Sequence, residues 1–206
     1  MGDVVDSGWL ELLRPCNNRT MGFAVLETSR LLIRRFVEND LADLVAYRRD
    51  PTVALYQDWD LDWSMVDAHR YLEHSDEPNL GTKGEWTQFA VLDRTSGRLC
   101  GDIGVHFIEA QPSTVEVGVT MSSEFQGLGF TAEAMRSVLA WLFSGFDTHR
   151  VFAHVDARNV PARALLTGLG FRQEAELLEA DWFKGEWTTL CVYAVLAKEW
   201  LEQANG

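Results

Sequence analysis

A turn that contains two glycines joins a strand to a helix, and it is the segment of the chain best suited to hold a ligand. It runs from Gln126 through Gly127 and Gly129. Apolar and polar residues alternate over 115–121, which is the period of a strand. From Met135 onward, apolar residues recur at i, i+3, i+4 and i+7, which is one face of a helix. Backbone N–H groups at such a helix start attract anions, so the turn is predicted to bind a phosphate.

A dinucleotide site is one interpretation of this turn. The spacing Gly127-x-Gly129-x-x-Ala132 fits the dinucleotide fingerprint. That fingerprint is expected near the start of a doubly wound domain, with several strand–helix units after it. Here 125 residues precede Gln126, and only about one such unit follows. The preceding strand also alternates, whereas a central parallel strand is apolar throughout. The dinucleotide interpretation is therefore disfavoured.

The same turn resembles the acyl-CoA pyrophosphate loop of the GCN5-related N-acetyltransferases (the GNAT family). The matching pattern is Gln126-x-x-Gly129-x-Thr131. Residues 126–134 are similar to the loop of the branch that acetylates ribosomal-protein N-termini, the RimJ/RimL type. Thr131 departs from the family pattern, because a glycine or alanine is usual there.

Three further segments resemble that branch in the same order, so the resemblance covers about residues 26 to 200. Residues 28–34 resemble its opening strand, and Asn159 with residues 169–171 resembles its Asn-x-x-Ser…Gly-Phe helix. Tyr193 lies where its last strand carries an aromatic residue. The resemblance implies acetyl-CoA as co-substrate and direct transfer to an amine in a ternary complex. It assigns cofactor contacts to Thr120, Met121, Gln126, Gly127, Leu128, Gly129, Phe130, Thr131 and Asn159.

Some of these roles have a plainer alternative. In the family, the strand that holds Thr120 and Met121 splays from the strand at residues 150–156, and one of their amides would then face the thioester carbonyl. The alternative is that these residues lie in an ordinary paired strand. Asn159 would contact the cofactor arm or would simply cap the helix that follows it. Ala162 stands where many relatives place a serine thought to protonate the leaving thiolate. Tyr193 would then donate that proton or would be a core residue, and otherwise the thiolate leaves unassisted or takes a proton from water.

Two carboxylates are candidates for the base that deprotonates the acceptor amine. Glu116 lies on the polar face of the strand that leads into the turn. Asp181 follows Phe171 by ten residues, close to where relatives carry a proposed basic glutamate. The alternative for Glu116 is a solvated carboxylate on a strand, and the alternative for Asp181 is an acid in a loop. A carboxylate with a pKa near 4 is a weak base unless burial raises that pKa, so either group could act through water.

Acids and indoles interleave ahead of a helix that relatives use as one wall of the acceptor pocket. Such a surface attracts cations, although acids before a helix start and tryptophans in the core explain it equally well. We expect a cationic primary amine as acceptor, with a small polyamine or aminoglycoside (hence a role in antibiotic resistance) slightly favoured over a protein N-terminus. A non-catalytic acyl-CoA-binding protein is the alternative. The acceptor candidates are Asp58, Trp59, Asp60, Trp63, Glu85 and Trp86.

Composition limits the partners. The 206 residues carry 31 acids against 18 bases, a net charge of −13, which disfavours nucleic acid and anionic membrane as partners. No apolar run approaches the length of a membrane span, and the histidines and three cysteines lack metal-ligand spacing, so no metal is expected. Acids near the start argue against a signal peptide, and scattered thiols fit a reducing cytoplasm.

The order of expected elements is typical of an α+β fold. We expect a GNAT fold with a central, mixed, mostly antiparallel sheet of about seven strands, splayed in the middle and flanked by about four helices. Ser64 and Asp67 have the spacing of a capping box for one helix. Residues 1–24 are expected to be a poorly ordered extension and 25–206 a single acetyltransferase domain. Relatives often pair, so a homodimer is expected.

Overall fold

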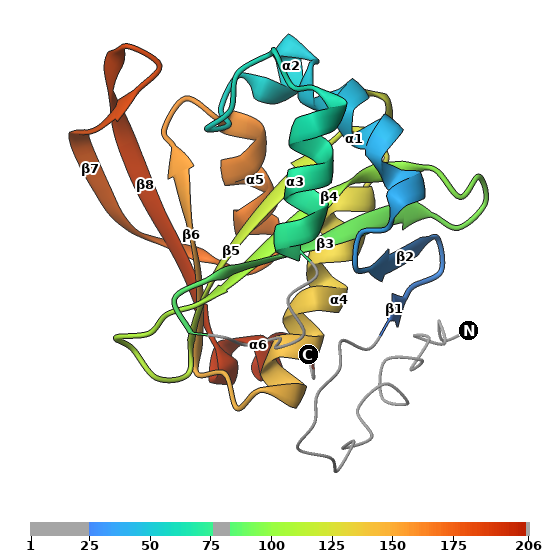
Figure 1. The fold of residues 1–206 in the computed structure, drawn as a ribbon. Coiled ribbons are helices and arrows are strands. Elements are labelled where there is room, and N and C mark those ends of the chain that lie inside the picture. The colour runs from blue at the N-terminus through green and yellow to red at the C-terminus, as the bar shows by residue number, and fades with distance from the viewer. Residues whose placement is uncertain (1–24, 76–82, 205–206) are drawn as a thin grey trace, which may run out of the picture.

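The computed structural model describes residues 25–75 and 83–204, and the extension expected over 1–24 lies outside them (Figure 1). Eight strands of this part form one mixed sheet in the order β1-β2-β3-β4-β5-β6-β8-β7. Every neighbouring pair is antiparallel except β5 and β6, which are parallel. The strands are β1 (Leu26–Glu27), β2 (Leu31–Arg34), β3 (Trp86–Asp93), β4 (Leu99–Phe107), β5 (Thr114–Met121), β6 (Arg150–Asp156), β7 (Arg172–Phe183) and β8 (Glu186–Leu196).

Helices cover both faces of the sheet. Figure 1 shows α1 and α3 on one side and α4 on the other, and each side has its own apolar core. The α+β class, the central sheet and the flanking helices are therefore as expected, with short extra elements beyond the four helices predicted. The helices are η2 (Glu38–Asp40), α1 (Leu41–Arg48), α2 (Pro51–Ala54), α3 (Met65–Ser75), η3 (Ser123–Phe125), α4 (Phe130–Gly145), α5 (Val160–Gly168) and α6 (Ala197–Ala204).

The alternation seen in β5 determines which side chains face which core. Val115 and Val117 are buried against the helix α4, whose Met135 and Leu139 are also buried. Each such side chain contributes about 1.5–3 kcal/mol of burial free energy. Glu116, between the two valines, points to the opposite face of the sheet, where α1 and α3 lie.

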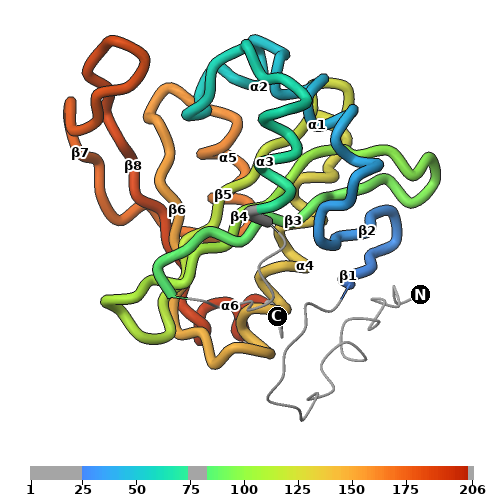
Figure 2. The backbone as a smooth tube through the Cα atoms, in the orientation of Figure 1, coloured from blue at the N-terminus to red at the C-terminus, as the bar shows by residue number. Residues whose placement is uncertain are grey.

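The structure contains the capping box predicted for one helix and places Asp181 in a strand. The capping box of α3 is present, because the Ser64 amide donates to Asp67 Oδ2 at 2.9 Å and the Asp67 amide donates to Ser64 Oγ at 3.3 Å. Asp181 is not a loop residue: β7 continues to Phe183, and Asp181 pairs with Thr188 of β8. Figure 2 shows the long β7–β8 hairpin rising at one end of the sheet.

Among the described helices, none combines the length and the apolar character that a bilayer crossing requires.

Candidate active site

The strands β5 and β6 part in the middle of the sheet. They pair only at residues 114–116 of β5 with 150–152 of β6, although each strand stays paired with its other neighbour along its length. The splay expected for this fold is therefore present. It leaves the backbone groups on one edge of 117–121 and of 153–156 without a partner strand.

The antiparallel pairing of β4 with β5 determines which amides face this opening. The Ser122 amide donates to the Cys100 carbonyl at 2.8 Å, in line with the β4–β5 ladder. Hydrogen-bonded and non-hydrogen-bonded pairs alternate along such a ladder. The Thr120 amide therefore points toward β4, and the amides of Val119 and Met121 point into the opening. Of the two amides expected at the thioester, Met121 has the suitable direction.

The turn after β5 has the backbone geometry of an anion site. Gly127 and Gly129 have φ values of +75° and +77°, a left-handed region that strongly favours glycine. Gly129 is the N-cap of α4, a helix of 16 residues whose first amides point toward the turn. Gln126 Nε2 donates to the Met121 carbonyl at 2.9 Å and so ties the turn to the end of β5. The Leu128 side chain is exposed.

A basic side chain that the sequence did not single out supports the same turn. Arg30 Nη1 donates to the Leu128 carbonyl at 2.9 Å, and the Arg30 guanidinium lies 4.7 Å from the centre of the Phe130 ring. Arg30 also forms an ion pair with Glu133 in the first turn of α4, at 2.6 Å. The predicted Thr131 lies half-buried in that first turn. The turn thus presents main-chain donors, and Arg30 holds it against the start of α4.

Glu133 joins the β1–β2 turn to α4. Its Oε1 accepts hydrogen bonds from the Thr28 hydroxyl at 2.5 Å and from the Ser29 hydroxyl and Arg30 amide, both at 3.1 Å. Partial burial raises the pKa of Glu133, but the hydrogen bonds from Thr28 and Arg30 outweigh it and leave the pKa below its ordinary value. The carboxylate is therefore ionised at neutral pH.

The start of α5 confirms one of the two interpretations of Asn159. Its Oδ1 accepts from the Ala162 amide at 3.1 Å, so Asn159 caps the helix. The Asn159 Nδ2 group is not used by this cap, and a contact with the cofactor stays a prediction. Ala162 packs against the apolar core and has no group that could protonate a thiolate.

Tyr193 lies in the core on the α4 face of the sheet. It is buried, it accepts from Arg163 Nε at 3.2 Å, and its hydroxyl donates to Gln173 Oε1 at 3.1 Å. Tyr193 pairs with Ala153 of β6, and Ala153 belongs to the same core cluster. Its hydroxyl is therefore on the opposite face of the sheet from Glu116.

Four side chains from four successive strands form a row across the other face, which we call the His–Glu row: Trp86 of β3, His106 of β4, Glu116 of β5 and His154 of β6. Glu116 Oε1 lies 2.7 Å from His154 Nδ1, and Oε2 lies 3.4 Å from His106 Nδ1. The Trp86 ring stacks on His106 with 5.1 Å between ring centres. The row includes two predicted residues, Glu116 and Trp86, and two histidines that sequence reasoning missed.

The charges in this row influence one another. Half-burial raises the pKa of Glu116, but the hydrogen bonds and charges of His154 and His106 outweigh it, so the pKa is lowered. The hydrogen bond to Glu116 raises the pKa of His154, burial opposes that shift, and the charges of Glu116 and Asp181 add to it. Asp181 therefore lies close enough to act on His154, which links both predicted carboxylates to one histidine.

The two indoles of the predicted acceptor surface already hold a cation of the chain itself. The Arg48 guanidinium lies 3.7 Å from the centre of the Trp59 ring and 4.6 Å from that of Trp63. Arg48 is buried and reaches Asp102 at 3.5 Å, and Asp102 accepts from the Tyr47 hydroxyl at 2.5 Å. The core interpretation of these tryptophans thus has direct geometric support. Asp58, Asp60 and Glu85 are exposed.

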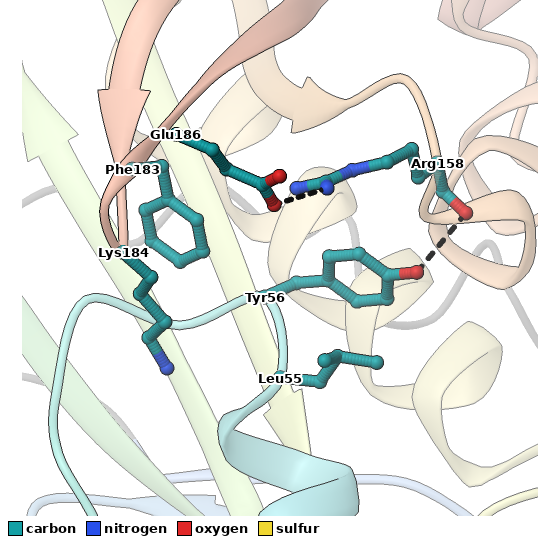
Figure 3. A pocket seen from close by; sticks show the side chains of 6 residues that line it. All are labelled: Leu55, Tyr56, Arg158, Phe183, Lys184 and Glu186. Carbon is teal, nitrogen blue, oxygen red and sulfur yellow. Dashed lines mark hydrogen bonds and ion pairs between the residues drawn. The ribbon is translucent and has the colours of Figure 1, made fainter.

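A pocket of about 170 Å³ lies where the tip of the β7–β8 hairpin meets the segment after α2 and the loop before α5 (Figure 3). Arg158 forms an ion pair with Glu186 at 2.6 Å, and the Tyr56 hydroxyl donates to the Arg158 carbonyl at 3.2 Å. Lys184 Nζ donates to the Ala54 carbonyl at 2.7 Å. The lining residues are Leu55, Tyr56, Arg158, Phe183, Lys184 and Glu186. Tyr56 opens the segment of acids and indoles noted in the sequence, but the other five were not predicted, because the pocket joins three segments that are distant in the chain.

Within the described ranges, no three histidine, cysteine, aspartate or glutamate side chains are grouped so that they could hold a metal ion. Cys100 and Cys191 are buried free thiols, and burial raises the pKa of Cys100 to about 12. Neither thiol is suited to act as a nucleophile, since the thiolate is the reactive form.

Comparison with known proteins agrees with this geometry. A family model described as an acetyltransferase (GNAT) domain matches residues 30–172. The protein p20 of Bacillus licheniformis, described as an uncharacterized N-acetyltransferase, is 24% identical over 175 residues, which are 85% of this chain and 97% of that protein.

Two solved structures share the fold. One is spermidine N-acetyltransferase from Vibrio cholerae in complex with CoA and spermine, with a TM-score of 0.72 and 21% sequence identity. The match covers 84% of this chain and 99% of that one. RimL, a ribosomal alpha-N-protein acetyltransferase in complex with coenzyme A, has a TM-score of 0.72 at 16% identity and covers 84% of this chain and 98% of its own.

Proposed function

The chain belongs to the acetyltransferase (GNAT) family and is an acetyl-CoA-dependent acyltransferase, and we propose that its acceptor is a primary amine on a small cationic molecule. The thioester of acetyl-CoA supplies the activated acetyl group. The glycine turn and the first amides of α4 would hold its diphosphate, and the Met121 amide would face its carbonyl. Left-handed Gly127 and Gly129 beside a helix N-terminus fit a diphosphate without any basic side chain in direct contact.

One observation supports a cationic acceptor most strongly, namely the His–Glu row at the point where β5 and β6 part. There an ionised Glu116 and the neighbouring Asp181 lie on the open face of the sheet, with the half-exposed Trp86 at the other end of the row. Carboxylates and an aromatic face attract an ammonium group. The net charge of −13 adds a long-range attraction for the same kind of molecule.

Direct transfer in a ternary complex is the mechanism consistent with these residues. Over residues 25–75 and 83–204 the two cysteines, Cys100 and Cys191, are buried, so neither offers an exposed thiol for a covalent acyl-cysteine step. The enzyme's work is then to hold the amine and the thioester in line, which can supply several kcal/mol of the barrier reduction. Initial-rate plots with both substrates varied are expected to intersect, and parallel lines would contradict direct transfer.

The acceptor is tested by acetyl-CoA turnover against three classes of amine: spermidine and spermine, aminoglycosides, and peptides with a free N-terminus. We expect turnover with a small polycation and little with the peptides. Turnover confined to the peptides would replace this proposal with a ribosomal-protein type of activity. Binding of CoA without turnover of any amine would favour a non-catalytic acyl-CoA-binding protein, the alternative that Ala162 supports.

A matched pair of variants tests the electrostatic part of the proposal. Asp181→Asn removes a charge that acts on His154 at longer range than Glu116 does, and Glu202→Gln removes one from the exposed surface of α6. One nearby unit charge is worth about 1 kcal/mol in a water-like medium, so the KM for the polycation is expected to rise about fivefold in D181N. An equal rise in E202Q would show that net charge, not this site, attracts the acceptor.

A further inference from the structure

His154 faces the opening between β5 and β6, and no sequence motif pointed to it. We infer that His154 is the catalytic residue that takes a proton from the acceptor ammonium, and that Glu116 is a positioning residue that acts through it. The inference rests on the proposed function, since it assumes an amine acceptor at the His–Glu row. In this inference His154, and not Glu116, is the direct base.

Glu116 is poorly placed to take the proton itself. Both of its carboxylate oxygens already face imidazole nitrogens, at 2.7 Å from His154 and 3.4 Å from His106. Its side chain is 17% exposed, whereas that of His154 is 41% exposed. A substrate that arrives from solvent therefore reaches the imidazole more easily than the carboxylate.

The contact with Glu116 determines which nitrogen of His154 is available. His154 Nδ1 is the atom that faces Glu116 Oε1, so in the neutral ring the proton lies on Nδ1 and the lone pair on Nε2. When Nε2 takes a proton, the adjacent carboxylate stabilises the imidazolium that results. The ring also meets Phe152 edge-on, with 5.4 Å between ring centres, and this contact restricts its rotation.

The position of His154 in the sheet is suited to this role. Phe152, two residues before it, is the last residue of β6 that pairs with β5, so His154 is the first side chain on that face beyond the pairing. The opening into which the amides of Val119 and Met121 point begins at the same level. An acceptor amine beside His154 would therefore lie at the entrance to the thioester site.

The charged groups that face His154 come from three strands. Glu116 of β5 is in direct contact, Asp181 of β7 acts at longer range, and His106 of β4 competes for the same carboxylate. Both carboxylates favour the imidazolium, so the pKa of His154 lies above its ordinary value. A base whose pKa is raised above that of an ordinary imidazole is better matched to proton transfer from an amine.

The proposed transfer conserves every proton. The acceptor ammonium loses one N–H proton to His154 Nε2, and its nitrogen then forms the C–N bond with the acetyl carbon. The C–S bond breaks, and the CoA thiolate takes the second proton of the nitrogen, directly or through water. The products are the acetamide, CoA thiol and one proton, which His154 releases to solvent. No oxidant, metal or further reactant is needed.

The test compares three variants of the full chain by the pH dependence of kcat/KM. Because the neutral imidazole is the active form, kcat/KM of the wild type is expected to rise with pH through the raised pKa of His154. His154→Gln is expected to lose about a hundredfold or more at neutral pH, the usual contribution of a general base. In Glu116→Gln the acidic limb moves to lower pH and kcat falls by a smaller factor. His149→Gln, at an exposed histidine just before β6, should match the wild type.

Two further measurements separate catalysis from folding. CoA affinity by calorimetry should be the same in H154Q and the wild type, and added imidazole should restore part of the turnover of His154→Ala. In the free wild-type protein, NMR titration of the His154 ring should give a pKa above the ordinary value. That pKa should be lower in E116Q and unchanged in E202Q.

Each outcome has one meaning. An active wild type whose rate and acidic limb survive in H154Q overturns the role of His154 and leaves the proposed function intact. A His154 pKa that is unchanged in E116Q overturns the role of Glu116. A wild type that acetylates no amine overturns the proposed function, and with it this inference.

Discussion

Replacing Gly127 with alanine probes the phosphate turn without adding a steric clash. A Cβ at Gly127 would meet nothing within 4 Å, so the change acts only through the left-handed φ of +75°. That conformation costs an L-residue about 1–2 kcal/mol. If the turn relaxes in the free protein and must be restored to bind the diphosphate, the whole cost appears as lost CoA affinity, about five- to thirtyfold. If the turn does not relax, the cost appears as lost stability instead.

Gly185 provides a matched control for this prediction. It has a φ of +88° at the tip of the β7–β8 hairpin, and a Cβ there would also meet nothing within 4 Å. In G185A the cost of about 1–2 kcal/mol should appear only as lost stability in urea unfolding. In G127A the same cost should be divided between lost stability and weaker CoA binding in calorimetry. If G127A binds CoA as tightly as the wild type and is not destabilised, the turn does not need the left-handed conformation and the assignment of the diphosphate site is wrong.

Two further predictions concern stability. Asp102→Asn leaves the buried Arg48 cation without its carboxylate, so the free energy of unfolding in urea should fall by about 3–5 kcal/mol; a loss below about 1 kcal/mol would show that the aromatic rings alone support that charge. The lowered pKa of Glu133 means that its carboxylate stabilises the fold above its unfolded pKa of about 4.3, and that this contribution is lost as pH falls through the folded pKa. The difference in Tm between the wild type and Glu133→Gln should therefore shrink from pH 6 to pH 3, and a constant difference would contradict the shift.

Much of the fold could be predicted because its signals are local. The alternation over 115–121 identified a strand and put Glu116 on the face opposite the valines, and the glycine spacing identified the turn. The Ser64–Asp67 capping box and the helix cap at Asn159 depend on residues three positions apart, so they too could be read without tertiary information.

The acceptor side was harder to predict because its contacts join distant segments. The sequence shows that Trp59 and Trp63 lie among acids, but only the packing of α1 against the loop before α3 reveals that Arg48 lies between the rings and the core. Arg30 and Glu133 are 103 residues apart, and their pairing depends on the position of β2 above the start of α4. A charge pattern along the chain therefore identified aromatic and acidic residues without showing what they contact.

The strand, the glycine turn and the helix of the proposed diphosphate site could be predicted from local sequence, since backbone preferences and hydrophobic period act over a few residues. The groups that meet Glu116, in contrast, depend on how distant strands come together. His154 lies 38 residues further along, and it reaches Glu116 because β5 and β6 pair in parallel for three residues and then part. Sheet order and register are set by the summed packing of both faces, so no local pattern could have placed the two residues side by side.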